Sequence, residues 1–114
     1  MTLLTEKISI PQLREMAEKG FGNLVKAVVD VRQRLIVVDA ELHADEELFL
    51  LENGSRQQDL LGINLYPDAD PNGADFIEYD SMINLRPSQK NRSRGVDDEE
   101  TRTAIVAIVK EWIA

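Results

Sequence analysis

The segment LVKAVVDVRQRLIVVDAEL, residues 24–42, restricts the fold of this chain more than any other stretch. It is rich in Val and Ile and contains neither Gly nor Pro, a composition typical of β-strands. We therefore predict two strands, residues 24–31 and 34–42, joined by a turn near Arg32 and Gln33. Because no glycine or Asn-Gly pair marks this turn, its type does not follow from the sequence.

A helix is predicted before these strands. Ser9 and Gln12 have the spacing of a capping box, in which each side chain bonds the other residue's backbone N–H. Pro11 falls in the first turn, where its missing N–H costs nothing. The helix should run to about Lys19 and end at Gly20.

A second helix is predicted at the C-terminal end of the chain, opened by Asp97 and Glu100 as another box-type cap. Apolar residues recur through it at helical spacing, which predicts that it lies on a sheet. These residues are Ala104, Ile105, Ile108, Val109 and Trp112.

Residues 44–53 allow two interpretations. Asp45 could cap a short helix that Gly54 ends, or Asn53-Gly54 could be the turn of a β-hairpin. We prefer the helix, because residues 55–59 do not alternate as a paired strand should.

Two further strands are predicted near residues 60–66 and 76–86, the second bent at Asp80-Ser81 and ended by Pro87. The resulting order, α-β-β-α-β-β-α, is typical of an α+β fold: a mostly antiparallel sheet of about four strands covered by helices. We expect residues 1–114 to form a single globular domain.

The composition excludes several classes of function. The chain has no cysteine, so thiol catalysis, disulfides and zinc-thiolate sites are excluded. Its formal net charge of −8 argues against nucleic-acid binding, which needs a positive surface. No signal peptide or membrane-spanning apolar run is present, so we expect a soluble cytoplasmic protein.

The charges are unevenly distributed along the chain. Between Arg56 and Arg86 the chain has six acidic side chains and no Lys or Arg. From Ser81 to Val96 it has no acidic side chain and four cations, all of them in residues 86–94, which we call the basic loop. These cations are Arg86, Lys90, Arg92 and Arg94.

Alternation along the predicted strands separates apolar from ionisable side chains. If the helices cover the apolar face, the other face collects Asp39, Glu41, His43, Asn64, Glu78, Asp80, Asn84 and Arg86. Such a face can simply be the solvated side of an antiparallel sheet. It can also be a polar binding surface, because so many like charges call for a compensating cation or partner.

The basic loop also has two interpretations. It could fold back on the sheet, so that Arg92 or Arg94 neutralises carboxylates within the protein. Alternatively, its arginines, together with Lys90 and Asn91, could bind an external anion. The acidic run 97–100 at the start of the last helix would compete with such an anion.

No metal or cofactor is predicted. Residues 68–73 resemble the start of a calcium-binding loop, but Tyr79 stands where the bidentate Glu is required. Asp39, Glu41 and His43 could ligate a divalent ion from one strand, although a single histidine is weak evidence for a metal site. No catalytic nucleophile stands out.

These features favour a binding or interaction module that uses the polar sheet face and the basic loop. The alternative is a small hydrolase or phosphate-processing enzyme centred on His43 and nearby carboxylates. A pocket containing both His43 and a loop arginine would favour the enzyme, whereas a flat face with every loop arginine paired would favour the module. An exposed apolar patch around Trp112 would indicate a protein partner or a homodimer.

Several stretches resemble an uncharacterised prokaryotic family known only as a domain of unknown function. They are ELHADEE (41–47), LENGS (51–55), GINLYP (62–67) and FIEYDSMINLRPSQKNRSRGVDD (76–98). The similarity runs from about Ile8 to the C-terminus, with Leu61 as a departure where the family has an aromatic residue. The resemblance implies a small cytosolic domain and supplies no catalytic residues.

Overall fold

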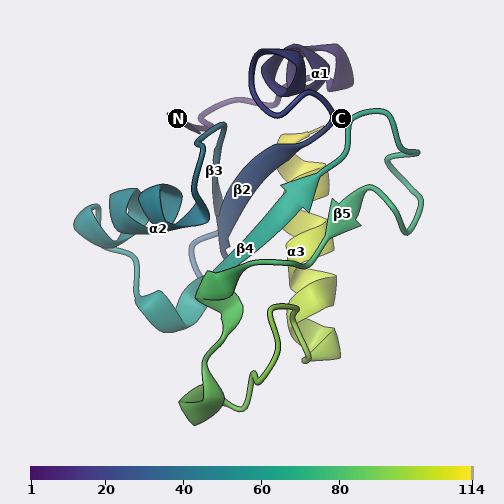
Figure 1. Ribbon diagram of the computed structural model, residues 1–114. Helices are drawn as coiled ribbons and strands as arrows, with labels where there is room; N and C mark the ends of the chain where they lie inside the picture. The colour runs from purple at the N-terminus through teal and green to yellow at the C-terminus, as the bar shows by residue number, and fades with distance from the viewer. Residues whose placement is uncertain (114) are drawn as a thin grey trace.

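The computed structural model describes residues 1–113 and shows one antiparallel five-stranded sheet with helices on both faces (Figure 1). The strand order is β1-β3-β2-β4-β5. The elements along the chain are β1 (Thr2–Leu3), α1 (Ile10–Lys19), β2 (Val25–Asp30), β3 (Leu35–Val38), α2 (His43–Glu52), β4 (Leu60–Leu65), β5 (Ile77–Glu78) and α3 (Glu99–Trp112). The α+β class is therefore confirmed, with β1 as a strand that the sequence did not predict.

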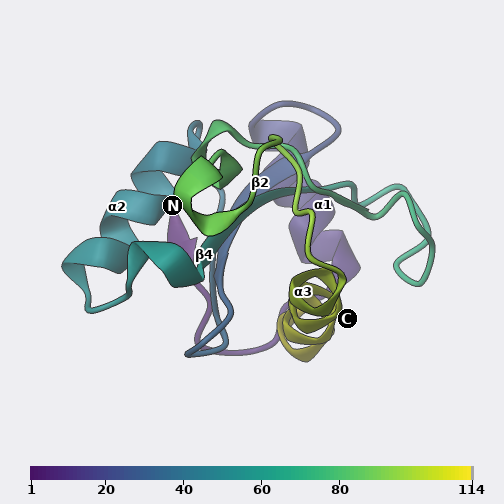
Figure 2. The ribbon, with the colours of Figure 1, turned by 90° about the horizontal axis from the view of Figure 1, so that it is seen from below.

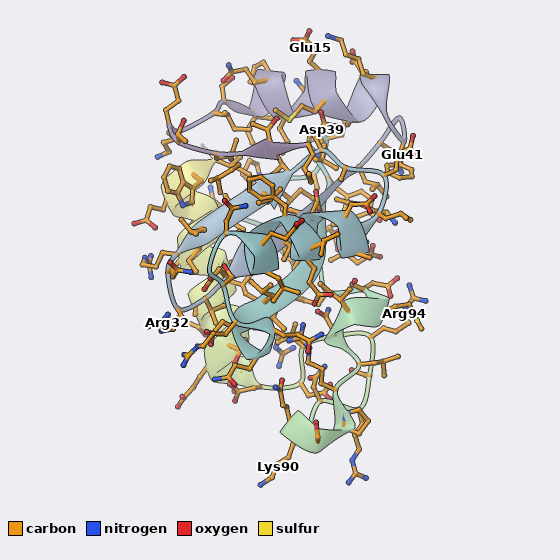
Figure 3. The ribbon with its side chains drawn as sticks, turned by 90° about the vertical axis from the view of Figure 1, so that its left-hand side faces the viewer. Glu15, Arg32, Asp39, Glu41, Lys90 and Arg94 are labelled. Carbon is orange, nitrogen blue, oxygen red and sulfur yellow. The ribbon has the colours of Figure 1, made fainter. Side chains whose placement is uncertain are left out.

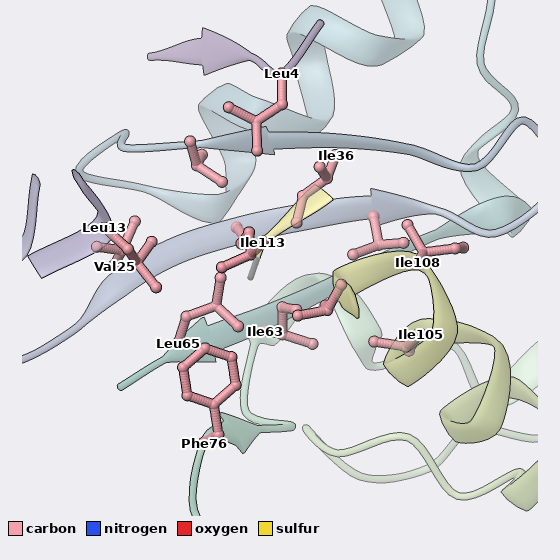
Figure 4. Close-up of a cluster of buried hydrophobic side chains, with 14 of the residues drawn as sticks. Leu4, Leu13, Val25, Ile36, Ile63, Leu65, Phe76, Ile105, Ile108 and Ile113 are labelled. Carbon is pink, nitrogen blue, oxygen red and sulfur yellow. The ribbon is translucent and has the colours of Figure 1, made fainter. Parts of the chain in front are cut away.

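The helices divide between the two faces of the sheet. Seen from below, α2 lies on one side of β2 and β4, whereas α1 and α3 lie on the other (Figure 2). The larger core fills the second side, where residues such as Leu13, Ile63 and Ile108 are fully buried (Figure 4). A smaller apolar group packs under α2 and includes Val28, Val37, Leu50 and Leu60. The expected open polar face is thus partly covered by α2.

The first and last helices follow their sequence signals closely. Ser9 and Gln12 form both bonds of the capping box, and α1 ends at Gly20. The cap of α3 is Asp98, whose carboxylate accepts the Thr101 N–H, so the predicted Asp97–Glu100 box is wrong by one residue. Asp97 instead accepts hydrogen bonds from the basic loop.

The turn between β2 and β3 is held by a buried carboxylate rather than by a glycine. Asp30 accepts the N–H groups of Arg32 and Gln33 and the Ser55 hydroxyl. Burial disfavours the charged form of Asp30, but these hydrogen bonds outweigh it and lower the pKa. β3 ends at Val38, four residues before the predicted end, because Asp39 has a positive φ of 69°.

The ambiguous segment 44–53 is helical, and α2 begins at His43 rather than after an Asp45 cap. One turn into this helix, Glu46 is fully buried. Its Oε2 accepts the Ala40 N–H at 3.2 Å, whereas Oε1 has no partner within the described residues. Burial raises the pKa of Glu46 to about 9, so its carboxyl is protonated at neutral pH.

The predicted strand 76–86 is wrong beyond its first residues. Only β5 pairs with β4, and the chain then forms a 3-10 helix at Met82–Asn84. Asn84 takes the place of a strand partner: its Oδ1 accepts the Gly62 N–H at 2.8 Å, and its Nδ2 donates to the Gly62 carbonyl at 3.0 Å. A side-chain amide therefore completes the edge of β4, and the main chain is free to turn away.

Both edges of the sheet are short. At one edge β1 pairs two residues with β3, and at the other β5 pairs two residues with β4. The three inner strands carry the longer pairings, six residues between β2 and β4.

Candidate functional site

A groove of about 600 Å³ lies on the part of the sheet that α2 leaves uncovered. We call it the sheet groove. It is lined by Phe21, Leu24, Lys26, Leu42, His43, Ala44, Asn64, Tyr66, Glu78, Asp80, Ser81, Met82, Ile83 and Arg94. These residues come from the segment between α1 and β2, from β2, β4 and β5, from the N-terminal end of α2 and from the segment after β5, so the fold brings distant parts of the sequence together.

The floor of the groove is a row of three side chains across the sheet. Lys26 on β2 is the register partner of Asn64 on β4, which in turn is opposite Glu78 on β5. Asn64 is only 7% exposed, and its Nδ2 donates to Glu78 Oε1 at 2.9 Å. Its Oδ1 is buried without a partner in the described part of the chain. Such an unsatisfied acceptor is unusual in a folded protein.

Glu78 is held by a second donor, the Tyr66 hydroxyl, at 2.9 Å. Burial and the Glu78 carboxylate both raise the pKa of Tyr66, so its hydroxyl keeps its proton and can donate. The carboxylate is therefore fixed in place by two neutral side chains.

His43 forms one wall of the groove and is 7% exposed. Its Nε2 lies 2.8 Å from the Ile63 carbonyl, which can only accept, so Nε2 carries the proton and Nδ1 is the acceptor nitrogen. Burial lowers the pKa of His43, which keeps the ring neutral near pH 7.

Gly62 explains how this wall approaches the sheet so closely. A Cβ at this position would lie 2.6 Å from Ser81 Oγ and 3.2 Å from His43 Cγ. Only glycine allows both side chains to pack against β4 at this point. Ser81 and His43 are thus neighbours above the same residue.

Apolar side chains form the rim of the groove. Phe21, Leu42 and Met82 are 49%, 55% and 64% exposed. Lys26 lies against this rim, with Nζ 5.2 Å from the centroid of the Phe21 ring. Ligand-binding clefts commonly combine apolar side chains with a few fixed polar groups, and the sheet groove has both.

The structure gathers only part of the predicted polar face. His43, Asn64, Glu78, Asp80 and Arg94 line the groove, although His43 reaches it from α2 rather than from a strand.

The remaining members of the predicted face lie elsewhere. Asp39 and Glu41 are exposed beside α1, away from Arg94 (Figure 3). Asn84 is fully buried and bonds β4, so its role is structural. Arg86 points to Glu47 of α2.

Two of the four cations of the basic loop are paired within the protein, and one of them, Arg94, was expected to neutralise a carboxylate. Arg94 pairs with Asp80 at 2.6 Å, and the mostly buried Arg86 pairs with Glu47 at 3.1 Å. Arg92 and Lys90 form no ion pair with any described residue, and Lys90 lies at the far end of the molecule (Figure 3).

Asn91 holds the basic loop together from inside. Its Nδ2 donates to the carbonyls of Asn84 and Gly95, and its Oδ1 accepts the Asp97 N–H. A second hollow of about 660 Å³ lies beside this loop, but Asp97, Asp98 and Asp59 line it as well. These acids oppose an external anion there.

The groups considered for metal binding are not assembled. Asp68 pairs with Arg14, and Asp70 accepts the Asn72 N–H within a turn. Among residues 1–113 no three His, Cys, Asp or Glu side chains are grouped so that they could hold a metal ion. In the same part of the chain, no helix combines the length and hydrophobicity that crossing a membrane requires.

The sequence analysis missed Lys26, Tyr66 and Ser81. Lys26 had a usable signal, because it is the one charged residue inside the apolar run 24–29 and shares a strand face with Val28. Ser81 had none, since its position depends on the turn after β5 and on Gly62 of another strand.

Comparison with known proteins identifies the family. No curated protein and no solved structure matches the chain. A family model described as "Protein of unknown function (DUF5674)" matches residues 2–112, almost the whole sequence. The chain therefore belongs to this family of proteins of unknown function.

Proposed function

We propose that the protein is a binding module and that the sheet groove is its ligand site. The observation that carries the proposal is the buried Asn64, whose Oδ1 lacks a donor at the floor of a groove with an apolar rim. A buried carbonyl without a donor costs about 1–3 kcal/mol, which a ligand donor would recover. From the basic loop, only Arg94 takes part.

The proposal is tested by NMR with ¹⁵N-labelled protein and a panel of divalent ions, phosphate, nucleotides, amino acids and short peptides. We expect at least one compound to shift the amide signals of Ala44, Asn64 and Ser81 in a saturable manner. Amides of the opposite face, such as Val106, serve as the internal control. If no compound perturbs the groove amides, the proposal fails.

A pair of matched variants locates the binding. Met82→Ser removes an apolar side chain from the rim of the groove, whereas Leu48→Ser removes an exposed leucine of α2 that does not line it. Any groove ligand should bind Met82→Ser at least fivefold more weakly than wild type and bind Leu48→Ser normally. Equal weakening by both substitutions would place the binding elsewhere.

A second candidate function is hydrolysis. The sheet groove contains both His43 and the loop residue Arg94, which is the arrangement expected of the enzyme, and Ser81 and His43 pack together above Gly62. It ranks second because Arg94 is already paired with Asp80. In such a reaction Ser81 Oγ would attack the carbonyl carbon of an ester while His43 Nδ1 takes the hydroxyl proton and passes it to the departing alcohol; water would then release the acyl group from Ser81 as a carboxylic acid. At present Ser81 Oγ accepts the Ile83 N–H, and no hydrogen bond joins Ser81 to His43 within residues 1–113.

An ester substrate and a serine-reactive fluorophosphonate test this candidate, with Ser81→Ala and His43→Gln as variants. If the protein is a hydrolase, the fluorophosphonate should label Ser81, and both substitutions should abolish the labelling. If the wild-type protein is not labelled, the hydrolase candidate is rejected and only the binding module remains. For either function the proposed location is the cytoplasm of a prokaryotic cell, which fractionation of cells expressing the tagged chain tests.

A further inference from the structure

The charges that line the sheet groove are balanced, unlike those of the whole chain. Lys26 and Arg94 are matched by Glu78 and Asp80, whereas the chain carries a net charge of −8. Arg94 and Asp80 already pair with each other. The groove therefore suits a ligand that has both an anionic and a hydrogen-donating group, rather than a polyanion.

One end of the groove offers unused donors. The N-cap of α2 is Leu42, whose side chain cannot accept a hydrogen bond. The backbone N–H groups of His43 and Ala44, in the first turn, have no acceptor within the described residues. Uncapped N–H groups at a helix N-terminus favour a negative ligand group.

Lys26 adds a positive charge at this end of the groove, and no carboxylate of the described residues neutralises it. Lys26 has no carboxylate within salt-bridge distance among the described residues, and its Nζ lies against Phe21 at the rim. Asp45, the exposed acid of the first turn, lines a different hollow together with Leu48. No carboxylate therefore occupies the donor groups from inside the protein.

The floor of the groove offers an unused acceptor, the Oδ1 of Asn64. The Nδ2 of this amide is engaged by Glu78, so the amide cannot rotate to exchange donor and acceptor without losing that bond. This oxygen has almost no exposed surface, so a ligand N–H reaches it only when the side chains around it move apart. The donor end and this acceptor belong to the same groove.

Building on the proposed function, we infer that the sheet groove binds a carboxylate whose neighbouring carbon carries an N–H or ammonium group and an apolar side chain. This chemistry is shared by a free α-amino acid and by the C-terminal residue of a peptide. The carboxylate binds the His43 and Ala44 N–H groups and Lys26. The ligand nitrogen donates to Asn64 Oδ1, and the apolar side chain packs on the rim.

Three probes test this inference by NMR titration: L-leucine, N-acetyl-L-leucine and L-leucinamide. Leucine or N-acetyl-leucine should shift the Ala44 and Asn64 amides, and leucinamide, which lacks the carboxylate, should bind at least fivefold more weakly. Tighter binding of N-acetyl-leucine identifies a peptide C-terminus, and tighter binding of leucine identifies a free amino acid. Equal binding of leucinamide would overturn the inference.

Two variants probe the donor end without threatening the fold. Leu42→Asp places a capping carboxylate where the ligand carboxylate would bind, so it should raise the melting temperature and weaken leucine binding at least fivefold. Lys26→Gln should also weaken binding at least fivefold, whereas Lys7→Gln, an exposed lysine that does not line the groove, should not. Unchanged affinity in both groove variants would contradict the inference.

The failure of this inference can be told apart from the failure of the proposed function. If another compound of the panel shifts the groove amides and neither acid does, the groove is a binding site but its ligand is of a different class. If no compound shifts them, both proposals fail.

Discussion

The buried Glu46 makes the stability of this protein depend on pH in a direction opposite to that of most carboxylates. Its pKa is raised from 4.5 to about 9 in the folded protein, chiefly by burial. Above pH 4.5 the unfolded chain releases this proton, whereas the folded protein keeps it. The folded state therefore binds more protons, and its stability falls as pH rises from about 4.5 towards 9.

The size of the effect follows from the two pKa values. One pKa unit corresponds to about 1.4 kcal/mol, so the free energy of unfolding should drop by about 4 kcal/mol between pH 5.5 and pH 8.5 because of Glu46 alone. Glu46→Gln stays neutral at every pH and removes this contribution. Its Oε1 can still accept the Ala40 N–H that now bonds Glu46 Oε2.

Urea unfolding followed by circular dichroism at pH 5.5, 7 and 8.5 measures the effect. The quantity to follow is the difference in unfolding free energy between Glu46→Gln and wild type at each pH. Packing effects that do not depend on pH leave the change in this difference unaffected. Glu52→Gln, an exposed glutamate at the end of the same helix, is the control and should follow wild type. If the unfolding free energies of Glu46→Gln and wild type changed with pH in parallel, Glu46 would be ionised in the folded protein and the reasoning would be refuted.

Three further outcomes are expected. Gly62→Ala places a Cβ against Ser81 and His43 and should lower the free energy of unfolding by about 2 kcal/mol or more. Gly20→Ala, the control, should change it by no more than about 0.5 kcal/mol. Equal effects of the two substitutions in urea titrations would contradict the close packing at Gly62. Glu47→Leu leaves the mostly buried Arg86 unpaired and should lower the free energy of unfolding by about 3 kcal/mol. Replacing Arg86 by Met in the same chain should restore most of this loss. A double variant that is no more stable than Glu47→Leu alone would argue against the ion pair. Because burial lowers the pKa of His43, the stability that its neutral ring contributes should be lost as pH falls below 6.5. NMR of the imidazole should give a titration midpoint below 6.5, with the proton on Nε2 at pH values above the midpoint. A midpoint at or above 6.5 would contradict the effect of burial on this ring.

Local signals in the sequence predicted the elements that depend on neighbouring residues. The capping box of α1 was found because both of its residues lie within one turn. The buried stripe Ile105, Ile108 and Val109 of α3 was found because helical spacing alone reveals it. β4, at Leu60–Leu65, was predicted to within one residue.

The errors occur where distant residues decide the structure. α2 begins at His43 without a capping side chain, so no local pattern could mark its start. β5 is short because the Asn84 side chain bonds Gly62, twenty-two residues away in sequence. The strand alternation was therefore extended past its true end, and Arg86 was assigned to a sheet face that it does not join.

The candidate site was predicted in part for the same reason. Asn64, Glu78 and their shared face follow from alternation along strands that do exist. The donor end of the groove depends on where α2 starts, and the place of Ser81 depends on Gly62 of another strand. These positions come from tertiary packing, which a single sequence does not display.

The brevity of the two outer strands limits how this molecule can associate. A strand that joins another chain needs a row of free backbone donors and acceptors, and two paired residues at either border leave too short a row for a stable extension. Fibre growth through added strands is thereby disfavoured. The ligand site proposed above would accordingly depend on side chains and on the N-terminal end of α2 rather than on added backbone pairing.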